Sequence, residues 1–135
     1  MAQLDVNTLI GAAIAARNLA YAPYSRFQVG AAVLSSSGRI FSGGNIENAS
    51  YPLAMCAERV AIYSAYAAGE CELQALAVVT PTSDVASPCG ACRQVILELA
   101  PHARIILLNL TGAIRYTSPN ELLPYGFGPA QLNDQ

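Results

Sequence analysis

The residues best suited to chemistry in this sequence are three cysteines and a glutamate, all near expected helix starts. The segment Pro88-Cys89-Gly90-Ala91-Cys92 places two thiols three residues apart on the first turn of a helix. Side chains at that spacing share a helix face and can bind one metal ion. The positive N-terminal end of the helix also favours the thiolate form. Taken alone, the two thiols are equally compatible with a redox pair, half of a structural zinc site or a chance spacing.

A third cysteine, Cys56, also stands at an expected helix start, with one buried strand and a loop between it and Cys89. In a right-handed strand–helix–strand arrangement, the N-termini of two helices that flank such a strand can meet at one end of the sheet. We therefore expect Cys56, Cys89 and Cys92 to converge on one ion. Three protein ligands are typical of a catalytic zinc site, whose fourth position holds water. Buried, inert thiols beside an accidental Cys-x-x-Cys spacing are the alternative.

Glu58 is the acidic residue beside a proposed ligand, whereas most other acids fall on expected helix surfaces, turns or termini. Residues two apart on a helix do not share a face, so Glu58 is poorly placed to bind the metal of Cys56. It is well placed to line the adjacent cavity as a general acid and base. Three thiolates give a zinc site a net negative charge, which we expect Arg59 and Arg93 to offset. A solvated helix residue and a plain surface cation are the alternatives for Glu58 and Arg59.

The placement of these residues depends on an alternation of helices and strands. Apolar spacing and end signals predict helices over 5–20, 55–68 and 90–99, and a brief final helix after 118. Strands are expected over 27–34, 39–42, 73–80, 104–110 and 114–117, with a loop over 43–52. Strand–helix–strand units imply parallel neighbours with helices on both sheet faces. We predict one domain over residues 1–135, an α/β fold built as a three-layer α/β/α sandwich with a central mixed five-stranded sheet.

The composition of the chain favours a small partner. The net charge is −2, and all seven basic residues are arginines, none of them adjacent. Binding to nucleic acid draws on clustered cations, so we expect no nucleic-acid partner. With 53% hydrophobic and 12% charged residues, we expect apolar surface to be buried between subunits. No signal-peptide pattern or membrane-length apolar stretch is present, so we expect a cytoplasmic protein without a membrane partner.

The order Cys-x-Glu, then Pro-Cys-x-x-Cys, is the signature of zinc deaminases. With three cysteine ligands, the chain resembles the small, homotetrameric cytidine deaminases. The resemblance rests on five blocks in order: Tyr21-Ala-Pro-Tyr-Ser-Arg-Phe27-Gln-Val-Gly, Asn45-Ile-Glu47-Asn-Ala-Ser-Tyr51, Cys56-Ala-Glu58-Arg59, Pro88-Cys-Gly-Ala-Cys-Arg-Gln94 and Leu122-Leu-Pro-Tyr-Gly-Phe127. It implies one zinc ion per chain, held by Cys56, Cys89 and Cys92. It also implies hydrolytic deamination of cytidine and deoxycytidine to uridine and deoxyuridine, with Glu58 moving protons to N3 and to the leaving ammonia.

The resemblance further implies a set of substrate contacts and sites shared between subunits of a homotetramer. The residues that it assigns to substrate binding are Phe27, Asn45, Glu47, Ala49, Tyr51, Ala57 and Phe127. Asn45 and Glu47 would hydrogen-bond the ribose hydroxyls, and Phe27 would pack on the base. Phe127 would reach into the site of a neighbouring subunit. A core position for Phe27, and ordinary loop roles for Asn45 and Glu47, are the alternatives.

Three other functions fit parts of this pattern. The first is deamination of another cytosine-bearing small molecule, such as blasticidin or dCMP, although no basic cluster or Gly-rich phosphate loop accompanies the ribose segment. The second is RNA editing by base extrusion, which the absence of lysine and of a basic face argues against. The third is a zinc-stabilised interaction module or a redox protein. Glu58 separates that third class from an enzyme, because neither alternative needs a proton carrier beside the thiols.

Overall fold

A five-stranded sheet forms the centre of this computed structural model, which describes residues 5–134. The strands are β1 (Gly30–Ser35), β2 (Ile40–Gly44), β3 (Leu73–Thr80), β4 (Arg104–Asn109) and β5 (Ile114–Thr117). Their order across the sheet is β2-β1-β3-β4-β5. The β3–β4 pair is parallel and the other three pairs are antiparallel, so the predicted mixed sheet is confirmed.

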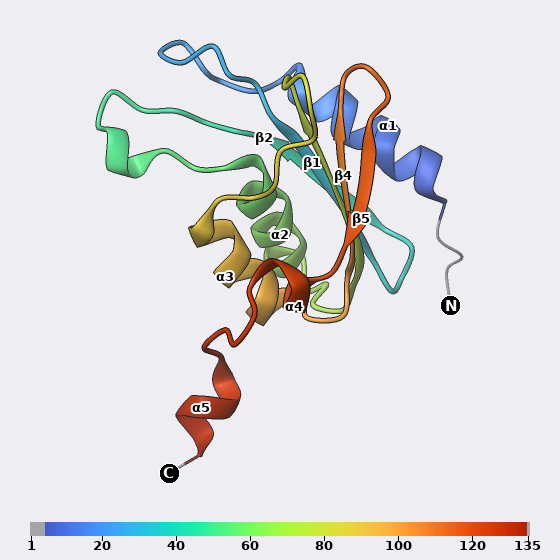
Figure 1. The fold of residues 1–135 in the computed structure, drawn as a ribbon, viewed down its shortest axis with the longest axis vertical. Helices are drawn as coiled ribbons and strands as arrows, with labels where there is room; N and C mark the ends of the chain where they lie inside the picture. The colour runs from blue at the N-terminus through green and yellow to red at the C-terminus, as the bar shows by residue number, and fades with distance from the viewer. Residues whose placement is uncertain (1–4, 135) are drawn as a thin grey trace.

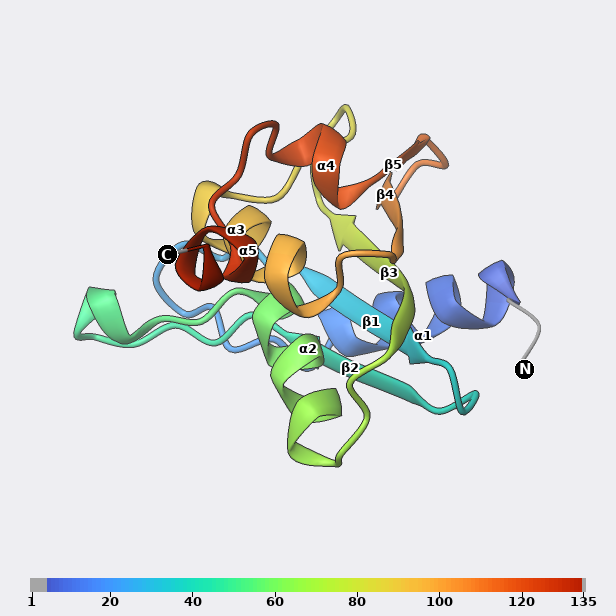
Figure 2. The same cartoon turned by 90° about the horizontal axis from the view of Figure 1, so that it is seen from below.

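Helices cover both faces of this sheet. The helix α1 (Val6–Arg17) packs on β1, β2 and β3, while α2 (Ala57–Ala67) packs on the opposite face beside α3 (Gly90–Leu99). Figures 1 and 2 show α1 on one side of the sheet and the other two helices on the other. The predicted three-layer α/β/α arrangement is confirmed. The short helices are η1 (Tyr51–Leu53), α4 (Pro119–Leu122) and α5 (Pro129–Asn133).

The central strand β3 shows why the sheet needs helices on both sides. Its side chains alternate between faces with a period of two. Ala75 and Ala77 belong to the apolar cluster under α1, whereas Leu76 and Val78 belong to the cluster under α2 and α3. All four are at most 3% exposed. The near-continuous apolar run in the sequence therefore does mark a strand buried on both faces.

Two glycines let α1 lie close against the sheet. A Cβ atom at Gly30 would come within 2.0 Å of the carbonyl oxygen of Ala13, and one at Gly44 within 2.8 Å of Ala20. The expected loop start at Gly43-Gly44 was wrong for this reason. These glycines end β2 where a helix crosses at short range, and they do not form a turn. The strand expected over 27–34 is also shifted, because β1 begins at Gly30.

The helix ends were predicted only approximately. Asp5 caps α1 through its side chain, but the helix ends at Arg17 rather than at Ala20. The backbone N–H groups of the next three residues bond three residues back, in a tighter turn. Met55 pairs with Ile46 as an isolated bridge, so α2 starts later than predicted, with Cys56 as its N-cap. The helix α5 was not predicted. None of the helices in residues 5–134 has the length and apolar character needed to cross a membrane.

Candidate active site

Three cysteine sulfurs meet where α2 and α3 begin. Cys56 is the N-cap of α2, Cys89 is the N-cap of α3, and Cys92 lies in the first turn of α3. The Sγ atoms of Cys56 and Cys89 are 3.9 Å apart. All three sulfurs lie within 4.8 Å of one another. The structure thus brings together the three thiols that the sequence predicted to converge.

The chemistry and spacing of these donors suit zinc. Tetrahedral zinc with Zn–S bonds of about 2.3 Å holds its sulfurs roughly 3.8 Å apart. The 3.9 Å between the sulfurs of Cys56 and Cys89 is close to that value. Within residues 5–134, no further histidine, cysteine, aspartate or glutamate joins the group. Three thiolates fit a zinc centre of the catalytic kind, in which water takes the fourth position.

Arg59 places positive charge against the sulfur cluster. Its Nη2 donates to Sγ of Cys56 at 3.4 Å, and its Nε is buried without a hydrogen-bond partner. Hydrogen bonds from Cys92 first, and then from Arg59, lower the pKa of Cys56 to about 5 against the opposing effect of burial. Cys92 is fully buried, and its hydrogen bond to Cys56 together with burial raises its own pKa. Cys56 is therefore a thiolate at neutral pH, which is the form that binds metal.

Glu58 lies in the first turn of α2, two residues from Cys56, and is only 6% exposed. Burial raises the pKa of its carboxyl group, and the negative charge of Cys56 adds to that effect. A carboxyl group whose pKa is moved toward the working pH can both accept and donate a proton. Its burial contradicts the alternative of a solvated helix residue.

Glu58 and Cys56 line one cavity of about 250 Å³. The residues around this metal-side cavity are Phe27, Val29, Asn45, Cys56, Ala57, Glu58, Thr80, Ala86 and Ser87. Phe27, Asn45 and Ala57 were all predicted to contact substrate, and the structure brings them to the same cavity as Glu58. Phe27 is 43% exposed and precedes β1, so the alternative of a core position in a strand is wrong.

Four residues of this cavity were missed by sequence reasoning: Val29, Thr80, Ala86 and Ser87. Their positions carried a usable signal. Thr80 is the last residue of β3, and ligands in α/β sheets bind beyond the carboxyl ends of strands. Ser87 stands two residues before the ligand Cys89. Threonine and serine occur in many structural roles, so their residue types alone do not indicate a functional site.

Asn45 braces the wall of the cavity. Its Oδ1 accepts a hydrogen bond from the backbone N–H of Val29 at 2.8 Å, and its Nδ2 donates to the carbonyl oxygen of Phe27 at 2.8 Å. The amide therefore fixes the segment that carries the Phe27 ring. A carboxamide has two N–H donors and two lone pairs, so one of each remains for a ligand. Asn45 can therefore both brace the loop, as an ordinary loop amide does, and contact a substrate.

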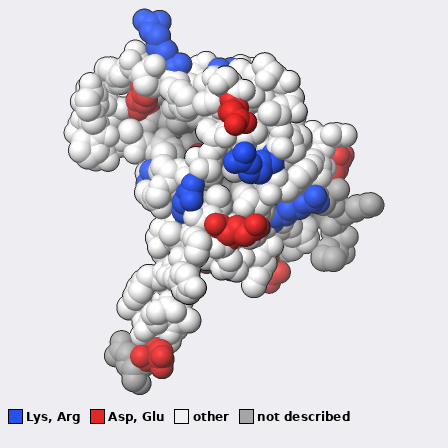
Figure 3. Space-filling view, in the orientation of Figure 1, with Lys and Arg blue, Asp and Glu red and all other residues white. Residues whose placement is uncertain are grey.

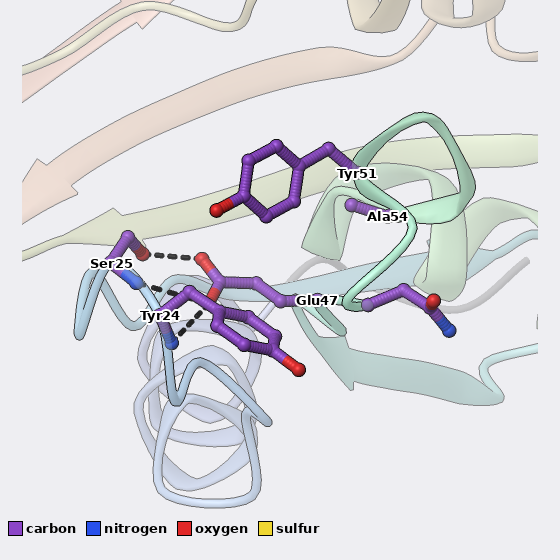
Figure 4. Close-up of a pocket in the computed structure, with 6 residues that line it drawn as sticks. Tyr24, Ser25, Glu47, Tyr51 and Ala54 are labelled. Carbon is purple, nitrogen blue, oxygen red and sulfur yellow. Dashed lines mark hydrogen bonds between the residues drawn. The ribbon is translucent and has the colours of Figure 1, made fainter.

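Glu47 and Tyr51 line a second pocket of about 360 Å³, together with Tyr24, Ser25, Asn48 and Ala54. Figure 4 shows the carboxylate of Glu47 between the rings of Tyr24 and Tyr51. It accepts hydrogen bonds from the backbone N–H groups of Tyr24 and Ser25 and from the Ser25 hydroxyl. The Ser25 hydroxyl is the main cause that lowers the pKa of Glu47. Glu47 therefore stays ionised at neutral pH.

Two predicted contact residues line neither pocket within one chain. Ala49 is exposed in the segment before η1. Phe127 is 56% exposed and follows α4 in a segment that extends away from the body of the molecule (Figure 1). Gln94 Nε2 donates to the carbonyl oxygen of Phe127 at 2.8 Å, which ties this segment to α3.

Arg93 does not offset the charge of the thiolates as expected. Its guanidinium donates from Nε to the carbonyl oxygen of Pro88 at 2.8 Å and from Nη1 to that of Leu122 at 2.7 Å. Its Nη2 donates to the Ser87 hydroxyl at 2.5 Å. The guanidinium is engaged by oxygen atoms, and Arg59 is the cation that touches sulfur.

The fold and the three-thiol centre define a zinc-dependent hydrolytic enzyme. Residues 5–108 match the sequence model of the cytidine and deoxycytidylate deaminase zinc-binding region. The chain is 50% identical over 132 residues to a cytidine deaminase of Halalkalibacterium halodurans, a match that covers 97% of this chain and all of the relative.

Solved structures agree with the sequence matches. The crystal structure of cytidine deaminase from Burkholderia pseudomallei has a TM-score of 0.89 at 50% identity and covers 92% of this chain and 100% of that one. The cytidine deaminase from Mycobacterium tuberculosis has a TM-score of 0.78 at 42% identity, covering 93% and 99%. The chain belongs to the cytidine and deoxycytidylate deaminase family. Zinc is its cofactor, and the Cys56, Cys89 and Cys92 cluster is able to bind it.

Proposed function

We propose that this chain hydrolyses cytidine and deoxycytidine to uridine and deoxyuridine, with release of ammonia. The observation that carries the proposal is one cavity of about 250 Å³ lined by both Cys56 of the three-thiol centre and the buried Glu58. A cavity of this size suits a small ligand, and its lining is apolar apart from a few polar groups. The cytidine deaminase relatives named above, 42% to 50% identical across nearly the whole chain, support the same substrate class.

The reaction replaces the C4–N bond of cytosine by a C4–O bond and needs two proton transfers. Zinc bound by the three cysteines supplies Lewis-acid activation of the attacking water. Glu58 carries the two protons of that water in turn, the first to N3 of the ring and the second to the departing amino group. Its raised pKa suits both directions of transfer. Arg59 stabilises the charge of the thiolates through its contact with Cys56.

The remaining polar groups position the substrate. Phe27 offers a half-exposed ring for stacking on the base, and Ala57 offers backbone groups at the N-terminus of α2. Asn45 keeps one donor and one acceptor for a ribose hydroxyl. Glu47 is ionised and accepts a second hydroxyl, while Tyr51 closes the adjacent pocket.

We further propose a homotetramer in which neighbouring subunits complete each site. Tyr51 is 73%, Leu53 68% and Phe127 56% exposed, on two segments that project from the body (Figures 1 and 2). Large apolar side chains on projecting segments are typical of surfaces that another protein covers. Ala49 and Phe127, which line neither pocket here, would then meet substrate in a neighbour. We place the enzyme in the cytoplasm, where thiols stay reduced for metal binding.

A small molecule is a better partner for this surface than nucleic acid. Figure 3 shows arginine side chains interspersed with acidic ones on the face displayed. Phosphate backbones are bound by clusters or stripes of cations. The pattern supports a small molecule such as a nucleoside as the substrate.

Zinc content and ammonia release on four substrates test the proposal. We expect one zinc per chain and fast turnover of cytidine and deoxycytidine, with slow turnover of dCMP and blasticidin. Turnover of only the last two would contradict the substrate assignment. A protein that binds zinc but releases no ammonia from any of the four would contradict the enzymatic function.

A further inference from the structure

One wall of the metal-side cavity is a loop without regular structure. Residues 81–88 join β3 to the N-cap of α3, and they contribute Ala86 and Ser87 to the cavity. In the described part of the chain, no hydrogen bond between two backbone atoms involves residues 82–88. The polar backbone groups of a loop need partners to hold one shape. Side chains must therefore hold this wall.

Asn109 holds the first part of the loop. It ends β4, is 3% exposed and donates from Nδ2 to the carbonyl oxygens of Thr82 at 3.2 Å and Ser83 at 3.1 Å. Its Oδ1 accepts from the backbone N–H groups of Thr111 and Ala113. The amide is fully used, and it fixes the loop as it leaves the sheet.

Arg93 holds the other end of the loop. The three nitrogens of its guanidinium bind the hydroxyl of Ser87, the carbonyl oxygen of Pro88 and the carbonyl oxygen of Leu122. Ser87 lines the cavity, and Pro88 directly precedes the ligand Cys89. Leu122 ends α4, so its carbonyl group has no partner within its own helix. A single side chain thus connects the cavity wall, the backbone before a zinc ligand and the C-terminal segment.

We propose that Arg93 is a positioning residue for the zinc centre. By clamping Ser87 and Pro88 against Leu122, it fixes the Cys89 thiolate for the metal and sets the shape of the substrate cavity. Its guanidinium binds oxygen atoms, and Arg93 is not among the residues that line the metal-side cavity. The inference rests on the proposed function in so far as the loop is a wall of a substrate cavity.

The geometry requires arginine at this position. Guanidinium donates in a fixed planar fork from three nitrogens, whereas a lysine ammonium is one point charge on a flexible stem. Each of the three guanidinium nitrogens binds a different acceptor: Nε binds the carbonyl oxygen of Pro88, Nη1 that of Leu122, and Nη2 the Ser87 hydroxyl. We therefore expect Arg93→Lys to recover only part of what Arg93→Ala loses.

Zinc affinity measured by competition with a chromophoric chelator tests the proposal without recourse to activity. Groups that orient metal ligands typically contribute about 10- to 100-fold in metal affinity. We expect Arg93→Ala to weaken zinc binding by about that factor, and Arg93→Lys by less. Arg104→Ala is the matched control, because Arg104 stacks over Tyr116 at the start of β4, the opposite end of the sheet from Asn109. It should bind zinc as the parent does.

Chemical rescue separates positioning from general stability. Millimolar guanidinium chloride should restore most of the zinc affinity of Arg93→Ala, while tetramethylammonium chloride at equal concentration should not. Guanidinium weakens folding in general, so it would worsen a variant that had only lost stability. Zinc affinity within twofold of the parent, or a loss that guanidinium deepens, would overturn the proposal.

These outcomes are distinct from those that test the enzymatic function. A parent protein that binds zinc but releases no ammonia would end the proposed function and leave the zinc measurements valid. An active parent whose Arg93→Ala variant binds zinc normally would end this proposal alone. If Arg93→Ala does not fold, the Arg93→Lys variant and its zinc affinity carry the same test.

Discussion

The starts of α2 and α3 are alike in sequence and differ in what they do. Each has a cysteine as N-cap, and an arginine follows that cysteine by three or four residues. At α2, the next side chains are a buried acid and an arginine that binds sulfur. At α3, the second thiol is buried and the arginine binds backbone oxygens. The start of α2 contributes one thiol, the proposed proton carrier and positive charge, and the start of α3 contributes two thiols and the side chain that braces them.

The comparison teaches that proximity in sequence to a metal ligand does not fix the role of a charged residue. Arg59 and Arg93 each neighbour the thiolates along the chain, and sequence reasoning gave them the same task. The side chains of Arg59 and Arg93 bind different partners because α2 and α3 pack against different neighbours. The α3 start faces the loop and α4, whose carbonyl oxygens need donors.

The largest expected effect comes from replacing Glu58, the proposed proton carrier at the start of α2. Glu58→Gln should lower the rate of ammonia release by roughly 10²- to 10⁴-fold, because general acid and base catalysis contributes that much. Zinc content should stay at one per chain, since Glu58 is outside the ligand group. Glu98→Gln, an exposed change on α3, is the control and should keep full activity. Undiminished activity in Glu58→Gln would show that the start of α2 does not provide the proton carrier.

A smaller loss is expected from Arg59→Gln, which leaves the Cys56 sulfur without its charged donor. Zinc affinity and kcat should fall about 10- to 100-fold, the usual range for groups that support metal ligands. Unlike Arg93→Ala, this variant should also raise the pKa of Cys56. If thiol titration showed the same change in the pKa of Cys56 for Arg59→Gln and Arg93→Ala, the two arginines would not have the different roles assigned to them.

Thiol reactivity after removal of zinc by a chelator compares the helices directly. The pKa of Cys56 is lowered to about 5, whereas the hydrogen bond to Cys56 and burial raise the pKa of Cys92 above that of an ordinary thiol. At neutral pH, iodoacetamide should label Cys56 more than about tenfold faster than Cys92, as read by mass spectrometry. The thiolate of Cys56 is lost as pH falls through about 5, so its labelling should slow below that pH. Faster labelling of Cys92 would contradict the assignment.

The smallest effects come from the residues that directly follow the two N-caps. Ala57 is fully buried, so Ala57→Val should lower the free energy of unfolding by about 1–3 kcal/mol through overpacking. A Cβ at Gly90 meets nothing within 4 Å, so Gly90→Ala should raise that free energy by up to about 1 kcal/mol. Thermal unfolding measures both. A large loss in Gly90→Ala would mean that another subunit covers the start of α3.

Local pattern predicted much of the fold because apolar periodicity and turn residues act over short range. The buried strands β3 and β4 and the helix α3 were predicted to within one residue at each end. Errors occurred where a neighbour distant in sequence set the boundary. Gly43 and Gly44 extend β2 because Val60 of α2 and the end of α1, respectively, approach them closely, and Met55 stays outside α2 because it pairs with Ile46.

The substrate residues show the same limit. Phe27, Asn45 and Ala57 share a cavity with Glu58, but Glu47 and Tyr51 line a neighbouring pocket. Residue type marked Glu47 as an acceptor, yet only the folded chain shows that Ser25 and Tyr24 already bind it. Thr80 and Ser87 went unnoticed because common residue types acquire meaning only from their surroundings.

The sequence by itself predicted the three clustered thiols, a candidate proton carrier and the alternation of elements, because thiols, carboxylates and apolar periods carry their chemistry locally. The tertiary structure decided which face of each helix start meets which neighbour. It directed Arg59 to sulfur and Arg93 to oxygen, and it buried Glu58 to raise its pKa. Burial and hydrogen-bond partners depend on contacts between segments far apart in the chain, and no local pattern encodes them.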